Sequence, residues 1–430
     1  MQQLVSQSLE IFEETIDYYE ALETFGRMGL EYTISLLQSR NTPNVKVNSC
    51  AGFKALWHRP LVPNTDLLTL FDLQPYDDGL MLRFPTPESP NQLTTYAQSA
   101  TISRVYTEYN QWGSIAGIAC AGDLNGQIAD GKTKQLVFLC EALQDLKIVE
   151  IAERIARRRD QVKLVLIAGP SSSGKTTFAA KLCTYLRTLG LKPRTLGTDD
   201  YYRAHEDPEY PRDAEGKLDF ETVDALRIPV LNDHLKRLFQ GEEVETPRFD
   251  LKLGKIKSGG RRMSLPEGGM IVMEGIFCLN PNLVPQIPAE QCYKIYIAPL
   301  SQLNLDEGHY ISNQIIRLVR RILRDFRHRG RDAAQTISRW RGVRRGEERN
   351  IFPFVDCANY IFNSSMDYEF CVLRALVQPL LEAVKPDQHE FGVAQELMRF
   401  LDHFDTIPSH LVPTSSVIQE FIGQSVFDSL

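Results

Sequence analysis

The hydrophobic and polar positions along the chain divide it into a mixed N-terminal part and a later part built around short apolar runs. From about 44 to 85, short apolar runs are broken by Pro, Gly and Asp, which predicts small strands and turns. We therefore expect an N-terminal α+β domain over 1–155, with a joint at 86–92. Before residue 40, apolar positions at three- and four-residue spacing predict one helix and part of another; they include Val5, Leu9, Phe12, Ile16 and Tyr19.

Continuous apolar runs begin after residue 160. The first, VKLVLIAG, ends at a glycine and shows no polar alternation, as expected of a strand that is buried on both faces of a parallel sheet. Helical patterns separate most of the later runs, and this alternation predicts a parallel α/β sheet flanked by helices over 156–385. Residues 386–430 are expected to form a helical extension. The five runs lie at 162–169, 194–198, 270–273, 293–298 and 359–362.

The first apolar run is followed directly by a match to G-x-x-x-x-G-K-[ST], and a helical pattern comes after it. In such a P-loop, glycines let the backbone curl so that successive N–H groups face phosphates, and the next helix adds its positive N-terminus. We expect Lys175 to reach the β- and γ-phosphates and the Thr176 hydroxyl to bind Mg²⁺. The residues expected to bind the nucleotide are Gly169, Ser171, Ser172, Ser173, Gly174, Lys175, Thr176 and Thr177.

Two acids stand at the ends of expected strands beside this loop. Asp199 follows the second strand and is placed to accept the proton of an acceptor hydroxyl, while Glu274 closes MIVMEG and is the better candidate for the metal. Plainer interpretations exist for both, since an Asp-Asp pair is often a turn or cap and Glu274 can begin a helix.

An arginine-rich helix is predicted in IIRLVRRILRDFRHRGRD. Its three- and four-residue spacing puts Arg317, Arg320, Arg321 and Arg324 on one face. Guanidinium groups stabilise the charge of a transferring phosphoryl group without changing protonation, so this helix is a candidate lid. A solvated basic helix or an RNA-contacting face is the alternative.

Composition narrows the functional classes. A net charge of -7 argues against a chain built mainly to coat nucleic acid, although it allows a local basic site. Eight cysteines without a CxxC pair predict reduced and mostly buried thiols. The acidic N-terminus is unlike a signal peptide, and no apolar run is long enough to span a membrane, so we expect a cytoplasmic location.

The part from about 160 to 385 resembles the uridine kinase and phosphoribulokinase family. The likeness is carried, in order, by GPSSSGKTT, DDYYR, FETVDAL, VETPRFD, IVMEGIF and the arginine-rich stretch. It implies ATP (or GTP) with Mg²⁺ and γ-phosphoryl transfer to the 5′-hydroxyl of a nucleoside such as uridine or cytidine. In this resemblance Asp199 is the general base, Asp224 binds the ribose hydroxyls and Glu274 stands on the Mg²⁺ side.

The same resemblance assigns roles to the lid. Arg321 and Arg329 are expected on the nucleotide, Arg324 and Arg331 in catalysis, and Arg331 also on the acceptor.

Three aromatic residues, Tyr201, Tyr202 and Phe249, are candidates to line the acceptor pocket, although aromatics after a strand also pack in cores. The family's base-reading histidine is replaced by Gly254, which leaves uridine as one candidate among several. Val223 stands where the family usually has proline.

The N-terminal part resembles the second additional domain of threonyl-tRNA synthetases, through GFKALWHRPLVPNTDLLTLFDLQPYDDGLMLRFP. In the synthetases an H-x-x-x-H pair with further Cys and His residues forms an editing site. None of the eight histidines here stands four from another. We therefore expect a module without hydrolytic chemistry, in which His58 is a surface or packing residue.

Two other functions stay open. One is a kinase for another small molecule, such as a sugar phosphate, a vitamin precursor or a modified nucleoside. The other is a nucleotide-sensing RNA-binding or regulatory protein, suggested by the synthetase-like module and the arginines; the overall acidity and Asp199 count against it. An oligomer is possible, but no coiled-coil heptad supports one.

Overall fold

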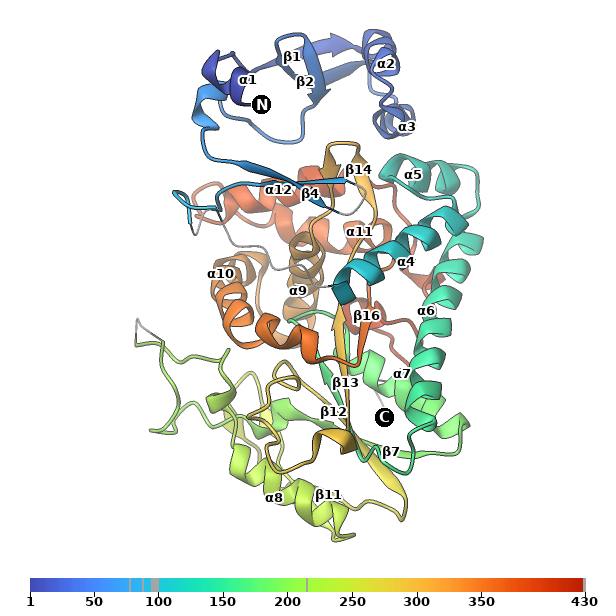
Figure 1. The fold of residues 1–430 in the computed structure, drawn as a ribbon, viewed down its shortest axis with the longest axis vertical. Helices are drawn as coiled ribbons and strands as arrows, with labels where there is room; N and C mark the ends of the chain where they lie inside the picture. Colours follow the sequence, from blue (N-terminus) through green and yellow to red (C-terminus); the bar gives the residue numbers. More distant parts are fainter. Residues whose placement is uncertain (77–78, 87–88, 94–99, 214–215, 428–430) are drawn as a thin grey trace.

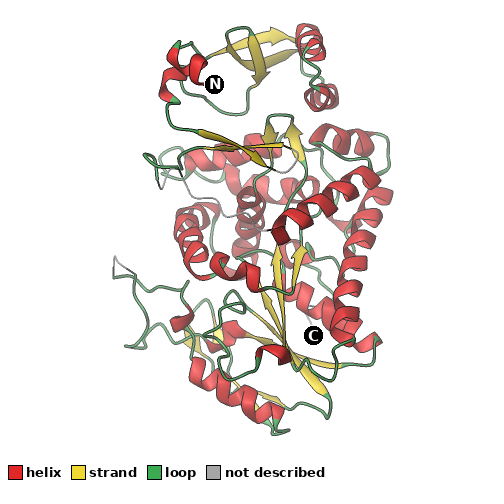
Figure 2. Ribbon diagram, in the orientation of Figure 1, coloured by secondary structure: helices red, strands yellow, loops and turns green. Residues whose placement is uncertain are grey.

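The computed structural model describes residues 1–76, 79–86, 89–93, 100–213 and 216–427. Its centre is a five-stranded sheet in the order β16-β13-β6-β12-β7, with every pair parallel (Figures 1 and 2). The predicted parallel α/β sheet is therefore confirmed. Its strands are β6 (Leu164–Ala168), β7 (Lys192–Gly197), β12 (Gly269–Glu274), β13 (Cys292–Ala298) and β16 (Tyr360–Asn363).

The central strand β6 divides its side chains between two hydrophobic cores. Val165 and Ile167 pack with α6 (Thr133–Ala156) and α7 (Lys175–Thr188). Leu164 and Leu166 pack on the other face, in a core that includes side chains of α4 (Ala100–Ala116) and α8 (Ile228–Phe239). Successive residues of a strand point to opposite faces, so helices on both sides explain why the run is apolar throughout.

A layer of helices lies between the sheet and the N-terminal module in Figure 1. Its aromatic core joins Phe370, Phe400 and Phe404, with ring centroids 4.9 to 5.4 Å apart. Side chains of the N-terminal module and of the C-terminal helices belong to this same core, so the last part of the chain packs against the rest; the boundaries at 155 and 385 stay predictions. The helices are α9 (Asn313–Arg329), α10 (Ala333–Asn350), α11 (Glu369–Glu382), α12 (Phe391–Leu401) and α13 (Gln419–Ile422).

The N-terminal module contains a small antiparallel sheet, and the helical prediction for residues 12–17 was wrong. These residues form β1 (Phe12–Asp17), which pairs with β2. β-Branched Thr15 and Ile16 favour a strand, and pairing with a distant segment decides between two weak local patterns. The other elements are α1 (Gln2–Ser6), α2 (Tyr18–Arg27), α3 (Glu31–Arg40), β2 (Asn44–Cys50), β3 (Phe53–Leu56), β4 (Asp72–Tyr76), β5 (Gly79–Arg83) and α5 (Ala121–Ala129).

Short strands connect the larger elements: β8 (Val244–Thr246), β9 (Phe249–Asp250), β10 (Lys255–Ile256), β11 (Arg261–Met263), β14 (Asn304–Asp306) and β15 (His309–Tyr310).

The predicted joint at 86–92 falls partly outside the described residues. Across the described part of the chain, none of the helices has both the length and the apolar character needed to cross a bilayer. All cysteines are free thiols and, apart from Cys50 and Cys357, they are buried as predicted.

A fully buried ion pair ties α9 to α11. Arg320 Nε donates to Glu369 Oε2 at 2.7 Å and Arg320 Nη2 donates to Oε1 at 3.0 Å, and the two side chains are 0% and 1% exposed. Replacing Arg320 with Met leaves the carboxylate of Glu369 buried without its partner. We expect R320M to lower the free energy of unfolding by about 3–5 kcal/mol. Urea denaturation measures this.

The matched control is Arg345→Met, at an exposed position of α10. It is expected to change the free energy of unfolding by less than about 0.5 kcal/mol. Equal effects of the two substitutions would contradict the structural role of the buried pair.

Candidate active site

The loop between β6 and α7 needs glycine at two positions, for different reasons. At Gly169, an added Cβ would lie 2.1 Å from the carbonyl oxygen of Ile297 on β13. At Gly174, the backbone has φ +88°, and an added Cβ would lie 2.3 Å from Val417 Cγ1. The first glycine lets the loop pass close to the sheet, and the second allows a left-handed turn under the C-terminal segment.

Two side chains of this loop form hydrogen bonds, and one of them contacts a residue that the sequence pointed to. Lys175 Nζ donates to the carbonyl oxygens of Gly169 and Pro170, at 3.0 and 3.1 Å, so the lysine folds back over its own loop. Thr176 Oγ1 donates to Glu274 Oε1 at 3.0 Å. The Thr176 hydroxyl and the Glu274 carboxylate, both expected to bind the metal, are thus in direct contact.

Sheet register explains why a third group joins them. Glu274 at the end of β12 is level with Gly197 at the end of β7, and Asp199 follows in the 3₁₀ helix η2 (Thr198–Tyr201). Burial, followed by the charge of Asp199, raises the pKa of Glu274 to about 7, while the Lys175 ammonium acts in the opposite direction. The carboxyl ends of parallel strands therefore bring two acids and one lysine together.

These residues fit a magnesium ion. Hydroxyl and carboxylate oxygens are the donors that Mg²⁺ prefers, and Thr176 and Glu274 supply one of each. Burial and the charge of Asp199 raise the pKa of Glu274 and so disfavour its carboxylate form, which a divalent cation would stabilise.

Carboxylates already occupy two amide groups of the loop. Glu347 on α10 accepts a hydrogen bond from the N–H of Ser171 at 3.0 Å, and Glu420 on α13 accepts one from the N–H of Thr177 at 3.2 Å. Glu347 is 1% exposed and paired with Arg317, so it is part of the scaffold. Glu420 is only partly buried. Both contacts illustrate the affinity of these amides for anions.

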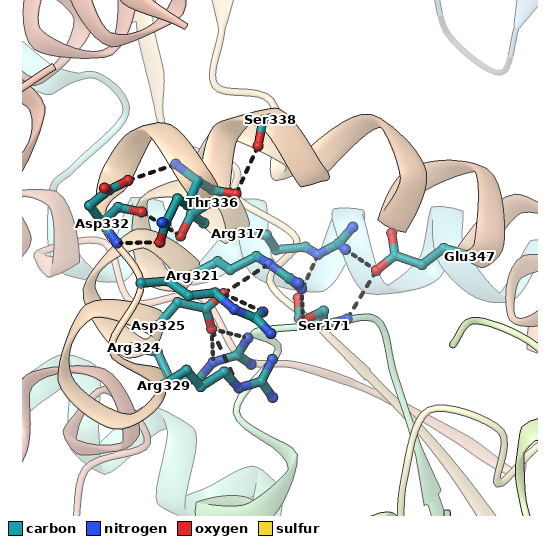
Figure 3. Close-up of polar contacts among 12 residues, drawn as sticks. Ser171, Arg317, Arg321, Arg324, Asp325, Arg329, Asp332, Thr336, Ser338 and Glu347 are labelled. Atoms are coloured by element: carbon teal, nitrogen blue, oxygen red, sulfur yellow. Dashed lines mark hydrogen bonds and ion pairs between the residues drawn. The ribbon is translucent and has the colours of Figure 1, made fainter. Parts of the chain in front are cut away.

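The arginine-rich helix surrounds one buried acid. Figure 3 shows Arg321, Arg324 and Arg329 pointing toward Asp325, which is 0% exposed. Arg321 Nη1 also donates to Ser171 Oγ at 2.6 Å, so the helix contacts the P-loop. Four ion pairs converge on Asp325, from Arg321 (3.5 Å), Arg324 (2.8 Å), Arg329 (3.6 Å) and Arg331 (3.8 Å).

The pKa values of two of these arginines are lowered by their burial and by their closeness to one another. Burial, followed by the charge of Arg324, lowers the pKa of Arg321 to about 10, and the same two causes lower that of Arg329 to about 10. Asp325, together with Glu221 near Arg321 and Asp199 near Arg329, does not fully offset the burial and mutual repulsion of these guanidinium groups, so this region favours the binding of an anion.

A cavity of about 550 Å³ borders η2 at Asp200, and one of the three expected aromatic residues lines it. Phe249 lines it, whereas Tyr202 is buried, with its hydroxyl donating to the carbonyl of Phe220 at 3.1 Å. The full lining is Asp200, Arg248, Phe249, Lys257, Gly260 and Arg261. Asp200 also accepts a hydrogen bond from the N–H of Phe249 at 3.0 Å.

Asp224 and Gly254 lie apart from the contacts described so far. Asp224 is exposed on the 3₁₀ helix η3 (Val223–Ala225), and among the described residues no hydrogen bond or ion pair joins its carboxylate to another candidate residue. An added Cβ at Gly254 would lie 2.0 Å from the ring of His205, whose centroid is 6.1 Å from that of Phe249. A histidine from a different segment thus stands beside the position where the family pattern lacks one.

Several residues of the site were missed by sequence reasoning. Glu347 and Glu420 are 176 and 243 residues from their partners in the loop, so no local pattern connects them. Glu221 belongs to the FETVDAL motif but had no assigned role; burial raises its pKa to about 7, even though the charge of Arg321 acts to lower it. Asp325 also had no assigned role, although it lies among the arginines with which it pairs.

The charge of Asp199 gives a test of this geometry that does not depend on activity. Asp199→Asn removes a negative charge beside Glu274, so the pKa of Glu274 is expected to fall from about 7 toward 4.5. Because the folded state binds this proton more tightly than the unfolded state, wild-type stability falls as pH rises from about 4.5 through 7, and the variant should lose less. Carboxyl ¹³C NMR titration measures the pKa. Asp233→Asn, at an exposed site on α8, is the control, and an unchanged pKa in the Asp199 variant would contradict the arrangement.

Comparison with known proteins adds an independent finding. A family model described as "Phosphoribulokinase / Uridine kinase family" matches residues 164–369. The uridine kinase of Mycoplasma pneumoniae is 29% identical over 180 residues, which cover 41% of this chain and 73% of that protein. Inorganic pyrophosphatase TTM2 of Arabidopsis thaliana is 24% identical over 190 residues, which cover 44% of this chain but only 24% of that protein. The chain thus spans about a quarter of the pyrophosphatase's length.

Among solved structures, that of a possible uridine kinase from Bacillus stearothermophilus covers 49% of this chain and 100% of its own, with 17% identity and a TM-score of 0.31. The family match begins at β6, includes the P-loop, the remaining strands of the sheet and the arginine-rich helix, and ends at Glu369. Residues 164–369 therefore form a domain of the phosphoribulokinase and uridine kinase family.

Proposed function

We propose that the protein is a kinase that transfers the γ-phosphoryl group of ATP (or GTP) to a hydroxyl of a small acceptor. The observation that supports this most is the contact of Thr176 with Glu274 beside the P-loop, with Asp199 at the same edge of the sheet. A phosphate-binding loop, a pair of metal-side oxygens and a candidate base are the parts that phosphoryl transfer requires. The uridine kinases among the relatives agree with this proposal.

In this proposal the loop holds the triphosphate. Its amides and Lys175 bind the phosphates, and Lys175 leaves the two carbonyl oxygens that it contacts here. Mg²⁺, when bound by Thr176 and Glu274, neutralises charge on the phosphates. The arginines around Asp325 then stabilise the negative charge of the transferring group, because together they carry more positive charge than Asp325 neutralises.

Asp199 takes the proton of the acceptor hydroxyl as general base. It is close enough to Glu274 and Arg329 for its charge to alter the pKa values of both, so it lies between the metal side and the lid. The buried pairs of Arg320 and Arg317 hold α9 in the core, so the expected lid is not the whole helix. In this proposal only its carboxyl end, with Arg329 and the following Arg331, closes over this region, which would exclude water and limit hydrolysis of the nucleotide.

A nucleoside is the first candidate acceptor. Phe249 lines the cavity beside Asp200, and the His205 ring stands near it, so an aromatic face and an imidazole are available to a base. Asp224 is the proposed partner of the ribose hydroxyls.

An anionic acceptor is the second candidate, and a specific observation favours it. Arg248, Lys257 and Arg261 line the same cavity, against the single acid Asp200. Three cations suit a phosphate or carboxylate group better than a neutral base. A sugar phosphate is such an acceptor.

Phosphoryl transfer is tested with the full chain, Mg²⁺ and ATP, against a panel of nucleosides, sugar phosphates and vitamin precursors. We expect phosphorylation of one acceptor class, and Asp199→Asn is expected to lower kcat by about 10²–10⁴-fold while nucleotide affinity changes little. Asp233→Asn is the control. Tight RNA binding without transfer to any acceptor would reject the kinase proposal in favour of a regulatory protein.

The C-terminal segment gives a separate prediction. Glu420 and a phosphate cannot both occupy the N–H of Thr177, so Glu420 must turn away when nucleotide binds. Glu420→Gln removes the like charge, and we expect ATP affinity to rise roughly three- to tenfold, as for a partly exposed charge pair worth about 1 kcal/mol. Calorimetry measures the affinity, with exposed Glu396→Gln on α12 as the control. Weaker binding by the variant would mean that Glu420 contributes to the nucleotide site.

A further inference from the structure

A cluster of histidines around one aspartate lies where the N-terminal module meets the β14–β15 hairpin. His58 follows β3, Asp306 ends β14 and His309 begins β15. His58 Nε2 lies 2.7 Å from Asp306 Oδ2, and His309 Nδ1 lies 2.7 Å from Asp306 Oδ1. His58 was expected to be a surface or packing residue, and its side chain is packed, at 10% exposed. Sequence reasoning missed only its partner, which stands 248 residues away in the sequence.

We propose that His58, Asp306 and His309 form a binding site for a divalent ion of the zinc class. Each offers one ligand atom, and these atoms all lie within 4.8 Å of one another. Imidazole nitrogens and a carboxylate oxygen are common zinc ligands, and bond lengths of about 2.0–2.2 Å would separate the ligand atoms by roughly 3–3.5 Å. Only small side-chain movements are needed to reach that separation.

The surroundings leave room for an ion to enter and for a water as fourth ligand. Asp306 and His58 are nearly buried, with side chains 4% and 10% exposed, but the side chain of His309 is 33% exposed. Three protein ligands with an open position are typical of zinc sites that keep a bound water. In the described residues, no cysteine belongs to the cluster, which disfavours ions that require thiolate ligands.

His403, in the loop after α12, supports His58 from the other side. Its Nε2 lies 3.2 Å from His58 Nδ1, and metal-bound histidines usually form a hydrogen bond through the second ring nitrogen. Without an ion, the same atoms can form a chain of hydrogen bonds in which a proton lies between His58 and Asp306.

The cluster is held together before any ion binds. Glu307, next to Asp306, accepts hydrogen bonds from the N–H groups of Tyr32 and Thr33 at 2.6 and 3.1 Å, at the start of α3. The hairpin and the N-terminal module are therefore fixed to each other by contacts other than the ligands. An ion would add a further link between them, and this inference does not depend on the proposed kinase function.

Co²⁺ and Zn²⁺ titration of the full chain tests the site. Co²⁺ is the probe because its visible spectrum reports nitrogen ligation, and excess Mg²⁺ occupies oxygen-only sites such as that of Thr176 and Glu274. We expect one equivalent of Co²⁺ per chain, displaced by Zn²⁺, and a rise in Tm with Zn²⁺. His309→Ala should abolish this rise and weaken binding by more than the roughly 10- to 100-fold expected of His403→Ala, which removes only a supporting hydrogen bond.

His389→Ala, at an exposed histidine, is the matched control and should bind like the wild type. His309 is partly exposed, so the variant is expected to fold, and Asp306→Asn provides a second test of the ligand set with a side chain of the same shape. Circular dichroism checks the fold of each variant. The proposal is overturned if wild type and His309→Ala bind Co²⁺ equally in excess Mg²⁺, which would leave the cluster as a hydrogen-bonded contact between the two parts.

Discussion

The P-loop depends on buried guanidinium groups that hold it from behind. Arg317 Nε donates to the carbonyl oxygen of Ser171 at 3.0 Å, while its partner Glu347 accepts from the N–H of the same residue. One ion pair therefore satisfies both the donor and the acceptor of a loop residue. This buried pair fixes Ser171 in one conformation, whereas the N–H of Thr177 is held by the partly exposed Glu420 and can be released for a ligand.

Charge is distributed around the loop in opposite senses on its two sides. On the sheet side, burial and the neighbouring charge of Asp199 raise the pKa of Glu274, and the Lys175 ammonium offsets this only in part. On the α9 side, several arginines surround Asp325, and burial together with the charge of Arg324 lowers the pKa values of Arg321 and Arg329. A cation on one side and a polyphosphate on the other would relieve both imbalances, which is why the site fits a metal–nucleotide complex better than either partner alone.

The C-terminal segment and the N-terminal module are joined to the kinase-family domain by different kinds of contact. Phe421 of α13 packs under Arg320, with the guanidinium carbon 5.0 Å from the ring centroid, and this anchors the segment that carries Glu420. On the other side, Glu307 of the β14–β15 hairpin binds the start of α3. Regions far apart in the sequence thus border the phosphate loop and the histidine cluster.

The sequence by itself determined the elements whose chemistry is local. A continuous apolar run identified each strand of the parallel sheet, and the P-loop, Glu274 and Asp199 could be predicted because parallel strands bring their carboxyl ends to one edge. The small strand β1 could not, because its local pattern also suits a helix and pairing with β2 decides between them. Tertiary structure alone decided that Glu347 and Glu420 occupy loop amides, that His205 stands beside Gly254 and that His58 meets Asp306 and His309. These contacts join residues with no shared periodicity, and they form only because packing of the helices and the hairpin brings separate segments together.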